Sequence, residues 1–386
     1  LGGQRIVMLE PRRLATRAAA RRMADTTRTQ VGELVGYQTR DERRIGSGTV
    51  IEVVTEGVLT RRLQNDPELP GVGLVIFDEV HERNLTTDLG LALALDVAST
   101  IRPDLRLLAM SATPDAEGLT ALLDAPVIES DGHMYDVEMH WAPRSPAGGG
   151  RNAGARRGRG PSRPGPGGGN RIEPDVVAVV QRALREQAGD VLVFLPGIGE
   201  IRRTESMLRD TVGPDVDVFP LAGALSLAEQ DAALAPSRPG RRRVVLSTDI
   251  AETSLTVDGV RVVVDSGLAR EPRFDARTGM TRLTTVATSR ASAEQRAGRA
   301  GRTEPGAAYR LWSKIEHGTR ARHRSPEIAQ ADLAGFALEL AAWGGGDELR
   351  FIDPPPAGAL AQARELLADL HAIDDGGSIT PLGRSM

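Results

Sequence analysis

The residues best suited to chemistry are two adjacent acids, Asp78 and Glu79, with His81 two positions later. They follow the apolar run 74–77, which Gly73 bounds on the other side, and this pattern predicts a buried parallel strand. The carboxyl ends of such strands form the ligand-binding edge of open α/β sheets. An aspartate there can hold Mg²⁺, directly or through water, while the glutamate orients or deprotonates an attacking water. The alternative is an acidic pair that caps the next helix.

The composition limits the class of protein. With 386 residues, 40% of them hydrophobic, the chain is expected to be globular with roughly two to three domains. Its net charge of −4 excludes a generally basic nucleic-acid coat, so a nucleic-acid contact should be a local groove. The absence of cysteine excludes disulfides and thiolate metal sites. No apolar run approaches about 18 residues and no signal-peptide pattern is present, so we expect a cytoplasmic protein without a membrane partner.

Two further strand ends in the first part of the chain carry polar residues. Residues 5–9 predict a short strand, and Arg12 and Arg13 then begin an Ala-rich helix. Arginines in a first helical turn oppose the helix dipole, which indicates either a solvated basic face or a contact with an anion. Residues 50–54 predict another strand, and Thr55 after it could simply cap the following helix.

The composition changes at residues 144–171, which are mainly Gly, Pro, Arg and Ser. Such a segment cannot bury enough apolar area to offset the entropy of ordering, so we predict a disordered linker. Its arginines could bind RNA non-specifically, although a flexible tether is the simpler interpretation. A second α/β unit follows, with predicted strands at 191–195 and 244–246, the latter followed closely by Thr248.

The segment QRAGRAGR at 295–302 places arginines three residues apart, with only Gly and Ala between them. Because nothing bulky intervenes, the guanidinium groups can approach a single anion. A positive cluster without a partner would be costly to hold together, so the spacing predicts a contact with a polyphosphate. A solvated, arginine-rich helix is the alternative.

Taken in order, these segments resemble the motifs of the DEAH-box helicases, and most closely those of the bacterial HrpB type of ATP-dependent RNA helicase. The resemblance is carried by EPRR at 10–13, TEG at 55–57, DEVH at 78–81, SAT at 111–113, LPG at 195–197, STDIAETS at 247–254, QRAGRAGR at 295–302 and FIDPPPAGAL at 351–360. It implies an α/β fold with two RecA-like parallel-sheet lobes, the first truncated at its N-terminus, followed by the start of a winged-helix domain. The corresponding boundaries are 1–143 for the first lobe, 144–171 for the linker, 172–325 for the second lobe and 326–386 for the winged-helix start.

The resemblance also implies roles for single residues. The catalytic set corresponds here to Asp78, Glu79, His81, Gln295, Arg299 and Arg302. The nucleotide-binding set corresponds to Arg22, Ser254 and Asp258. Ser111 and Thr113 correspond to the residues that couple the nucleotide site to the other lobe. The nucleic-acid contacts correspond to Arg12, Arg13, Thr55 and Thr248. Asp78 and Glu79 would hold Mg²⁺, partly through water. The side chains of Arg299 and Arg302 would act on the γ-phosphate of ATP.

The activity that the resemblance implies is hydrolysis of ATP with Mg²⁺, coupled to 3′→5′ translocation on single-stranded RNA, with DNA as the alternative track. One part of such a site is absent, because no GxxxxGK[ST] loop occurs and the only lysine, Lys314, has no glycine loop before it. The chain also begins without Met, so we expect a parent enzyme that hydrolyses ATP and a fragment that does not. The alternative is a non-catalytic RNA-binding or assembly module.

Overall fold

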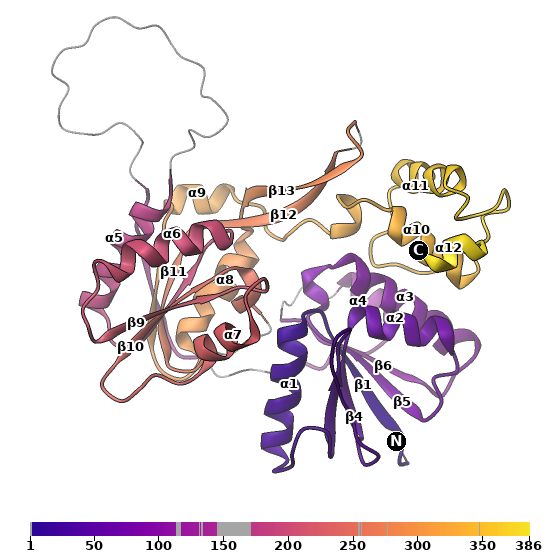
Figure 1. Cartoon of the computed structure of the whole chain (residues 1–386), viewed down its shortest axis with the longest axis horizontal. Helices are drawn as coiled ribbons and strands as arrows, with labels where there is room; N and C mark the ends of the chain where they lie inside the picture. The colour runs from indigo at the N-terminus through magenta and orange to yellow at the C-terminus, as the bar shows by residue number, and fades with distance from the viewer. Residues whose placement is uncertain are drawn as a thin grey trace, which may run out of the picture. The chain divides into compact units, whose positions relative to one another are not determined.

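The computed structural model describes residues 2–112, 117–130, 132, 134–144, 171–253, 255, 257–275, 277–346 and 348–386. The chain forms two compact units (Figure 1), of which the first comprises Leu1–Ser130, Glu271–Thr284 and Arg324–Met386 and the second Asp131–Arg270 and Thr285–His323. Almost all of the predicted linker at 144–171 lies outside the described residues. Within the described ranges, no helix combines the length and the apolar character that crossing a membrane requires.

A six-stranded sheet in the order β3-β2-β4-β1-β5-β6 forms the centre of the first unit. Its strands are β1 (Arg5–Glu10), β2 (Val35–Gln38), β3 (Arg43–Arg44), β4 (Ile51–Thr55), β5 (Val72–Phe77) and β6 (Arg106–Ala109). All neighbours pair in parallel except β3, which is antiparallel to β2. Because Leu9 of β1 lies opposite Phe77 of β5, the residues that come next, Glu10 and Asp78, reach the same edge of the sheet.

Helices cover this sheet and bring the end of the chain into the same core. They are α1 (Arg13–Thr26), α2 (Glu56–Asn65), η1 (Val80–Glu82), α3 (Leu85–Thr100), α4 (Glu117–Leu123), η4 (Glu327–Ala329), α10 (Ala334–Trp343), α11 (Ala357–Asp369) and α12 (Pro381–Ser385). Helix α3 is apolar along most of its length and is buried through nearly all of its turns. Leu89 and Leu93 of α3 belong to one apolar cluster together with Phe336 and Leu340 of α10.

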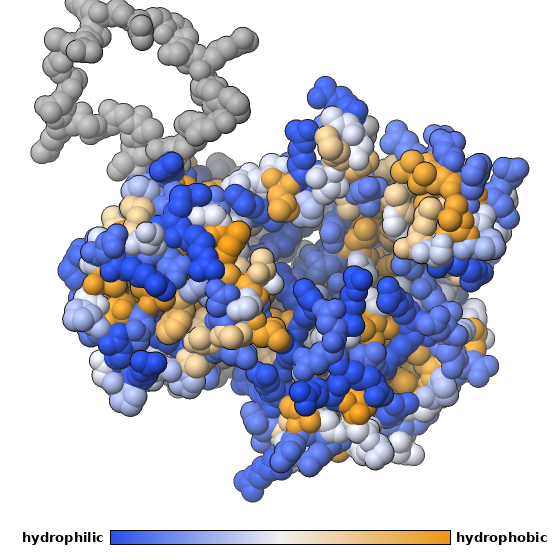
Figure 2. Space-filling model, viewed as in Figure 1, coloured by the Kyte–Doolittle hydropathy of each residue, from blue (hydrophilic) through white to orange (hydrophobic). Residues whose placement is uncertain are grey.

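Residues 326–386, here named the C-terminal module, are therefore packed into the first unit and do not form a separate compact body. The sequence boundaries separated this segment from the first lobe. Exposed leucines gather on the module, where Figure 2 shows a concentrated apolar area. Leu366, Leu370 and Leu382 are each about half exposed there.

A second six-stranded sheet, in the order β7-β14-β11-β8-β10-β9, is parallel throughout. Its strands are β7 (Val137–Trp141), β8 (Asp190–Phe194), β9 (Val216–Leu221), β10 (Arg242–Ser247), β11 (Val260–Asp265) and β14 (Gly306–Arg310). The accompanying helices are α5 (Glu173–Glu186), α6 (Ile198–Arg209), α7 (Leu227–Leu234), η2 (Asp249–Ala251), α8 (Arg290–Gly298), η3 (Arg299–Gly301) and α9 (Lys314–Thr319), and β12 (Leu268–Asp275) forms a hairpin with β13 (Met280–Ala287).

Strand β7 corrects the predicted boundary of the first lobe at residue 143. It pairs with β14 from Val137 to Trp141, so these residues belong to the second sheet. The segment VEMHW has only weak apolar character, and an edge strand needs burial on fewer sides than a central one. Sequence pattern alone therefore gave no reason to assign it to the second sheet.

Candidate functional site

Two carboxyl groups meet at the carboxyl edge of the first sheet. The backbone N–H of Asp78 donates to the carbonyl of Leu9 at 3.1 Å, which holds Asp78 beside the end of β1. Glu10 at that end is only 4% exposed, and its Oε2 has no hydrogen-bond partner among the described residues. Burial, together with the neighbouring Asp78 carboxylate, raises the pKa of Glu10 to about 9, and burial also raises the pKa of Asp78. This edge is therefore short of positive charge.

Glu79 occupies a strained backbone position immediately after Asp78. Its φ of 54° lies in the left-handed region, which non-glycine residues seldom adopt and which is found most often at functional sites. Its N–H donates to Asp78 Oδ1 at 2.7 Å. His81 Nε2 lies 3.4 Å from Glu79 Oε2, and His81 Nδ1 accepts the N–H of Ala112 at 3.2 Å. Because Nδ1 accepts, Nε2 carries the proton and faces the glutamate.

The same contacts connect the acidic turn to the end of β6. The N–H of Met110 donates to the carbonyl of Phe77 at 2.8 Å, and the N–H of Val80 donates to the carbonyl of Met110 at 3.2 Å. Ser111, predicted as a coupling residue, is exposed and directly precedes the residue that bonds to His81. Its predicted partner Thr113 lies outside the described residues.

The arginines predicted at the start of α1 have different surroundings. Arg12 Nη2 donates to Glu82 Oε2 at 3.1 Å, and Glu82 is almost fully buried, so Arg12 faces the acidic turn. Arg13 pairs with Asp41 at 2.6 Å, and both of these side chains are largely exposed. Arg22 is exposed close to the end of the helix. The structure thus brings Arg12 to Glu82, next to the predicted catalytic His81 in the chain, and leaves Arg13 at the surface.

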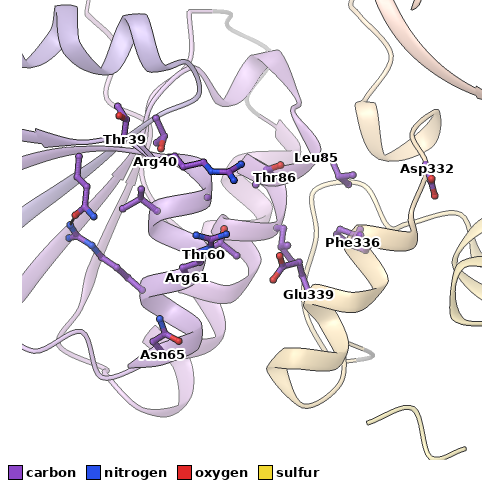
Figure 3. A pocket seen from close by; sticks show the side chains of 17 residues that line it. Thr39, Arg40, Thr60, Arg61, Asn65, Leu85, Thr86, Asp332, Phe336 and Glu339 are labelled. Atoms are coloured by element: carbon purple, nitrogen blue, oxygen red, sulfur yellow. Dashed lines mark hydrogen bonds between the residues drawn. The ribbon is translucent and has the colours of Figure 1, made fainter. Parts of the chain in front are cut away.

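A pocket of about 670 Å³ lies between the start of α2 and α10. Thr55, the residue that precedes α2, lines it and makes no capping hydrogen bond through its side chain. Arg40 and Arg61 line the same wall (Figure 3), and neither makes an ion pair or side-chain hydrogen bond within the described part of the chain. Glu339 points toward α2 from α10. A hydroxyl, a helix N-terminus and two unpaired guanidinium groups together suit a phosphate.

In the second unit, Arg296 is fully buried within the QRAGRAGR segment. Its guanidinium contacts Glu252 at 2.8 Å and Asp265 at 3.0 Å, and it lies over the ring of Phe194 at 4.8 Å from the ring centroid. Burial alone would lower the pKa of Arg296, but the carboxylates of Asp265 and Glu252 raise it. The sequence analysis missed this residue, because its partners come from other segments and no local signal marks it as buried.

Arg299 and Arg302 differ in what their surroundings allow. Arg299 is buried, and its Nε donates to the carbonyl of Glu252 at 2.8 Å. Its two terminal nitrogens donate to the carbonyls of Glu252, Thr253 and Leu255. The guanidinium therefore holds the loop that follows η2. Arg302, after η3, is exposed.

The remaining predicted residues of this unit spread over two edges of the sheet. Thr248 follows β10 at the carboxyl edge, whereas Asp258 precedes β11 at the amino edge, where its carbonyl accepts from Arg243 Nη2 at 2.6 Å. Gln295 is half-buried on α8, and Ser254 lies outside the described residues. The structure therefore does not bring Thr248 and Asp258 together.

Two glycines of the segment are explained by packing. A Cβ on Gly301 would lie 2.5 Å from the carbonyl oxygen of Tyr135 and 2.8 Å from Cγ2 of Val137. A Cβ on Gly298 would lie 2.8 Å from Cε of Met134. The N–H of Tyr135 also donates to the carbonyl of Gly301 at 2.9 Å. From the sequence, the small residues were expected to let several arginines approach one anion. In the structure, residues 134–137 pack so closely against Gly298 and Gly301 that a side chain there would collide with them.

Comparisons with known proteins agree with this arrangement. Residues 175–304 match the helicase conserved C-terminal domain, and residues 363–386 match the winged-helix helicase associated domain (HA2). The chain is 45% identical over 385 residues to the ATP-dependent RNA helicase HrpB of Escherichia coli, which covers 99% of the chain and 45% of the relative. It is 34% identical to the probable ATP-dependent RNA helicase DHX34 of Homo sapiens, over 99% of the chain and 33% of the relative.

A solved structure shows the same fold. The crystal structure of the E. coli DEAH/RHA helicase HrpB superposes with a TM-score of 0.88 at 45% identity, over 99% of this chain and 46% of the other. The chain thus spans less than half the length of these relatives. The predicted α/β fold, with two parallel-sheet lobes and the start of a winged-helix domain, is confirmed. Over nearly its whole length the chain is therefore similar to the DEAH-box helicases, and among the relatives compared here to the HrpB type.

Proposed function

We propose that the whole protein is an ATP-dependent RNA helicase that couples hydrolysis of ATP to 3′→5′ movement on single-stranded RNA. The observation that carries this proposal is the turn at Asp78 and Glu79, where a strained glutamate is held between an aspartate and His81. A carboxylate kept in a rare backbone conformation by two side-chain contacts is positioned for one task. In a nucleotide hydrolase, that task is to orient the attacking water.

Mg²⁺ fits the chemistry of this edge. Asp78 and Glu10 are desolvated carboxyls that lie together, and the buried Oε2 of Glu10 has no hydrogen-bond partner among the described residues. Mg²⁺ is bound in phosphate-transfer sites by one or two carboxylates together with water and phosphate oxygens. Asp78 would hold the ion, with Glu79 contributing through water, and the ion would supply the positive charge that the acids lack.

Arginines of the QRAGRAGR segment are proposed to supply positive charge to the phosphates. Arg302 follows η3 and is exposed. We therefore prefer it over Arg299 as the arginine that contacts the γ-phosphate. Arg299 keeps its predicted role only if its guanidinium exchanges backbone carbonyls for phosphate oxygens, because four of its N–H groups are engaged in the structure described. Gln295 would help to position the attacking water.

The nucleic-acid track is proposed to pass over the pocket at the start of α2. Thr55 and the first N–H groups of α2 would bind one backbone phosphate, and Arg61, one turn further along, would meet the next. Such contacts recognise the backbone and do not read sequence. The relatives are named as RNA helicases, which favours RNA over DNA.

The test is to replace Glu79 by Gln in the whole protein. The variant should bind ATP as the wild type does, while RNA-stimulated turnover falls by about 10²–10⁴-fold because the carboxylate that activates water is lost. Turnover is measured with RNA and with DNA oligonucleotides of the same length, and the exposed Glu68 changed to Gln serves as the control.

Unchanged turnover in the Glu79→Gln variant would remove Glu79 from its role. A wild-type protein that binds RNA but hydrolyses no ATP would favour the alternative of a non-catalytic RNA-binding or assembly module. Stronger stimulation by DNA than by RNA would make DNA the track.

A further inference from the structure

Arg83 closes the acidic turn on the side opposite Glu79. Like Glu79, it has a left-handed backbone, with a φ of 55°. Its Nη2 donates to Asp88 Oδ2 on α3 at 3.0 Å and forms an ion pair with Asp353 Oδ2 of the C-terminal module at 2.6 Å. Asp88 is 3% exposed, so the Asp88 side of this charge cluster is shielded from water. A half-buried arginine between two carboxylates fixes the position of the backbone that carries it.

Glu327 of the C-terminal module holds the same stretch of backbone by two further bonds. Its N–H donates to the carbonyl of Arg83 at 3.0 Å, and its Oε2 accepts the N–H of Leu85, the first residue of α3, at 2.8 Å. Asn84, which precedes the helix, makes no capping hydrogen bond of its own. A carboxylate at a helix N-terminus satisfies an unpaired N–H and is stabilised by the helix dipole. The start of α3 is thus capped by a residue of the module.

These contacts matter because the turn from Glu79 to Arg83 is bracketed by two residues in a costly conformation. A left-handed non-glycine residue is strained and persists only where its surroundings impose that conformation. Asp78 and His81 fix the Glu79 end. At the Arg83 end, the fixing contacts include Asp353 and Glu327 from the module as well as Asp88.

We propose that Arg83, Glu327 and Asp353 are positioning residues through which the C-terminal module holds Glu79 in its working conformation. The module is then part of the device that sets the rate of ATP hydrolysis, although none of its residues belongs to the predicted catalytic set. This inference rests on the proposed function of Glu79. It assigns to the module a role in the chemical step that is separate from any contact with nucleic acid.

The test is Asp353→Ala in the whole protein, because its side chain is 44% exposed and its loss should not prevent folding. We expect kcat for ATP to fall about fivefold to tenfold with KM nearly unchanged, since the loss affects positioning and not binding. The kcat of Asp353→Asn should lie between that of Asp353→Ala and that of the wild type. The double variant Arg83→Ala/Asp353→Ala should be no slower than Arg83→Ala alone, because both changes break one interaction.

The matched control is Trp343→Phe. It removes the bond from Trp343 Nε1 to Asp96 Oδ2 at 2.8 Å, which joins the same module to α3 at a site away from the turn. This variant should melt at a lower temperature and keep the kcat of the wild type. If Asp353→Ala leaves kcat unchanged, or if Trp343→Phe lowers it equally, the positioning role is wrong.

A second measurement separates failure of this inference from failure of the proposed function. Amide hydrogen exchange of residues 79–85 can be followed in the chain whether or not the protein hydrolyses ATP. Asp353→Ala should increase exchange there at least tenfold, while Trp343→Phe leaves it unchanged. Equal exchange in both variants would overturn the inference, and a wild type without ATPase activity but with the expected exchange pattern would overturn only the proposed function.

Discussion

The acidic edge of the first unit and the arginine segment of the second unit balance their charges differently. Glu10 and Asp78 lie together in a desolvated position, and burial raises both of their pKa values. Arg296 and Arg299 are also buried, but carboxylates and backbone carbonyls of the same unit satisfy them. The cation proposed for the first site would therefore stabilise it, whereas these two arginines already have partners within their own unit. A run of like charges in a sequence does not by itself show that a ligand is needed.

The largest effect is expected from Arg296→Met, which tests whether the second unit balances its own charge. The change leaves Glu252 and Asp265 buried without their cation, and breaking a buried pair from one side costs about 3–5 kcal/mol. Chemical denaturation of the second unit measures the loss. The control is Arg209→Met, which removes a largely exposed arginine from Glu205 but leaves that glutamate paired with Arg202, and it should cost less than about 1 kcal/mol. Equal losses in the two variants would contradict the conclusion that Arg296 balances the buried charges of Glu252 and Asp265.

A smaller effect is expected from Gly301→Ala, which tests whether the small residues of the segment serve packing. The new methyl group would meet backbone at 2.5 Å, and such overpacking costs about 1–3 kcal/mol. Gly298→Ala should cost less, because it meets only the flexible end of Met134. Gly318→Ala on α9, with nothing within 4 Å, should be neutral or stabilising. Thermal unfolding ranks the three, and any other order would contradict the packing explanation.

The smallest effect, when compared per pH unit, is a change in the pH slope of stability, and it tests whether Glu10 stays protonated in the folded protein. The pKa of Glu10 is raised from 4.5 to about 9, so the folded protein keeps a proton that the unfolded chain releases. The stabilising contribution is complete below pH 4.5 and is lost as the pH rises toward 9, by at most about 1.4 kcal/mol per pH unit.

Glu10→Gln keeps the shape of the neutral acid and cannot ionise. Its free energy of unfolding should therefore fall less steeply with pH than that of the wild type across this range, as measured by denaturant titration without Mg²⁺. Glu68→Gln should retain the wild-type slope. Parallel slopes for Glu10→Gln and the wild type would show that Glu10 ionises normally.

Sequence reasoning identified the acidic edge because its signal is local. An apolar run that ends in Asp78 and Glu79 determines both the strand and the edge to which it leads. Glu10 could have been found in the same way, since it ends a parallel strand in the register of Asp78. The bonds of Arg299 could not, because its partners lie on a loop more than forty residues earlier, and only the folded path of both segments brings them together.

The sequence also indicated what the C-terminal module is without showing where it packs. Residues 363–386 match the winged-helix domain that was expected there. The bond between Trp343 and Asp96 spans 247 residues, and nothing in the local pattern of either segment predicts it. Contacts of this length depend on tertiary packing, which periodicity and turn chemistry do not specify.

The cap that Glu327 places on α3 has a consequence for biosynthesis. Leu85 leaves the ribosome 242 residues before its capping partner, which at about 5–20 residues per second is a delay of roughly 10–50 s. During that time the face of α3 that later packs on α10 has no cover, so the nascent chain presents apolar surface to the cell. A chaperone that binds extended apolar helices is therefore expected to associate with this chain before its acidic turn can be completed.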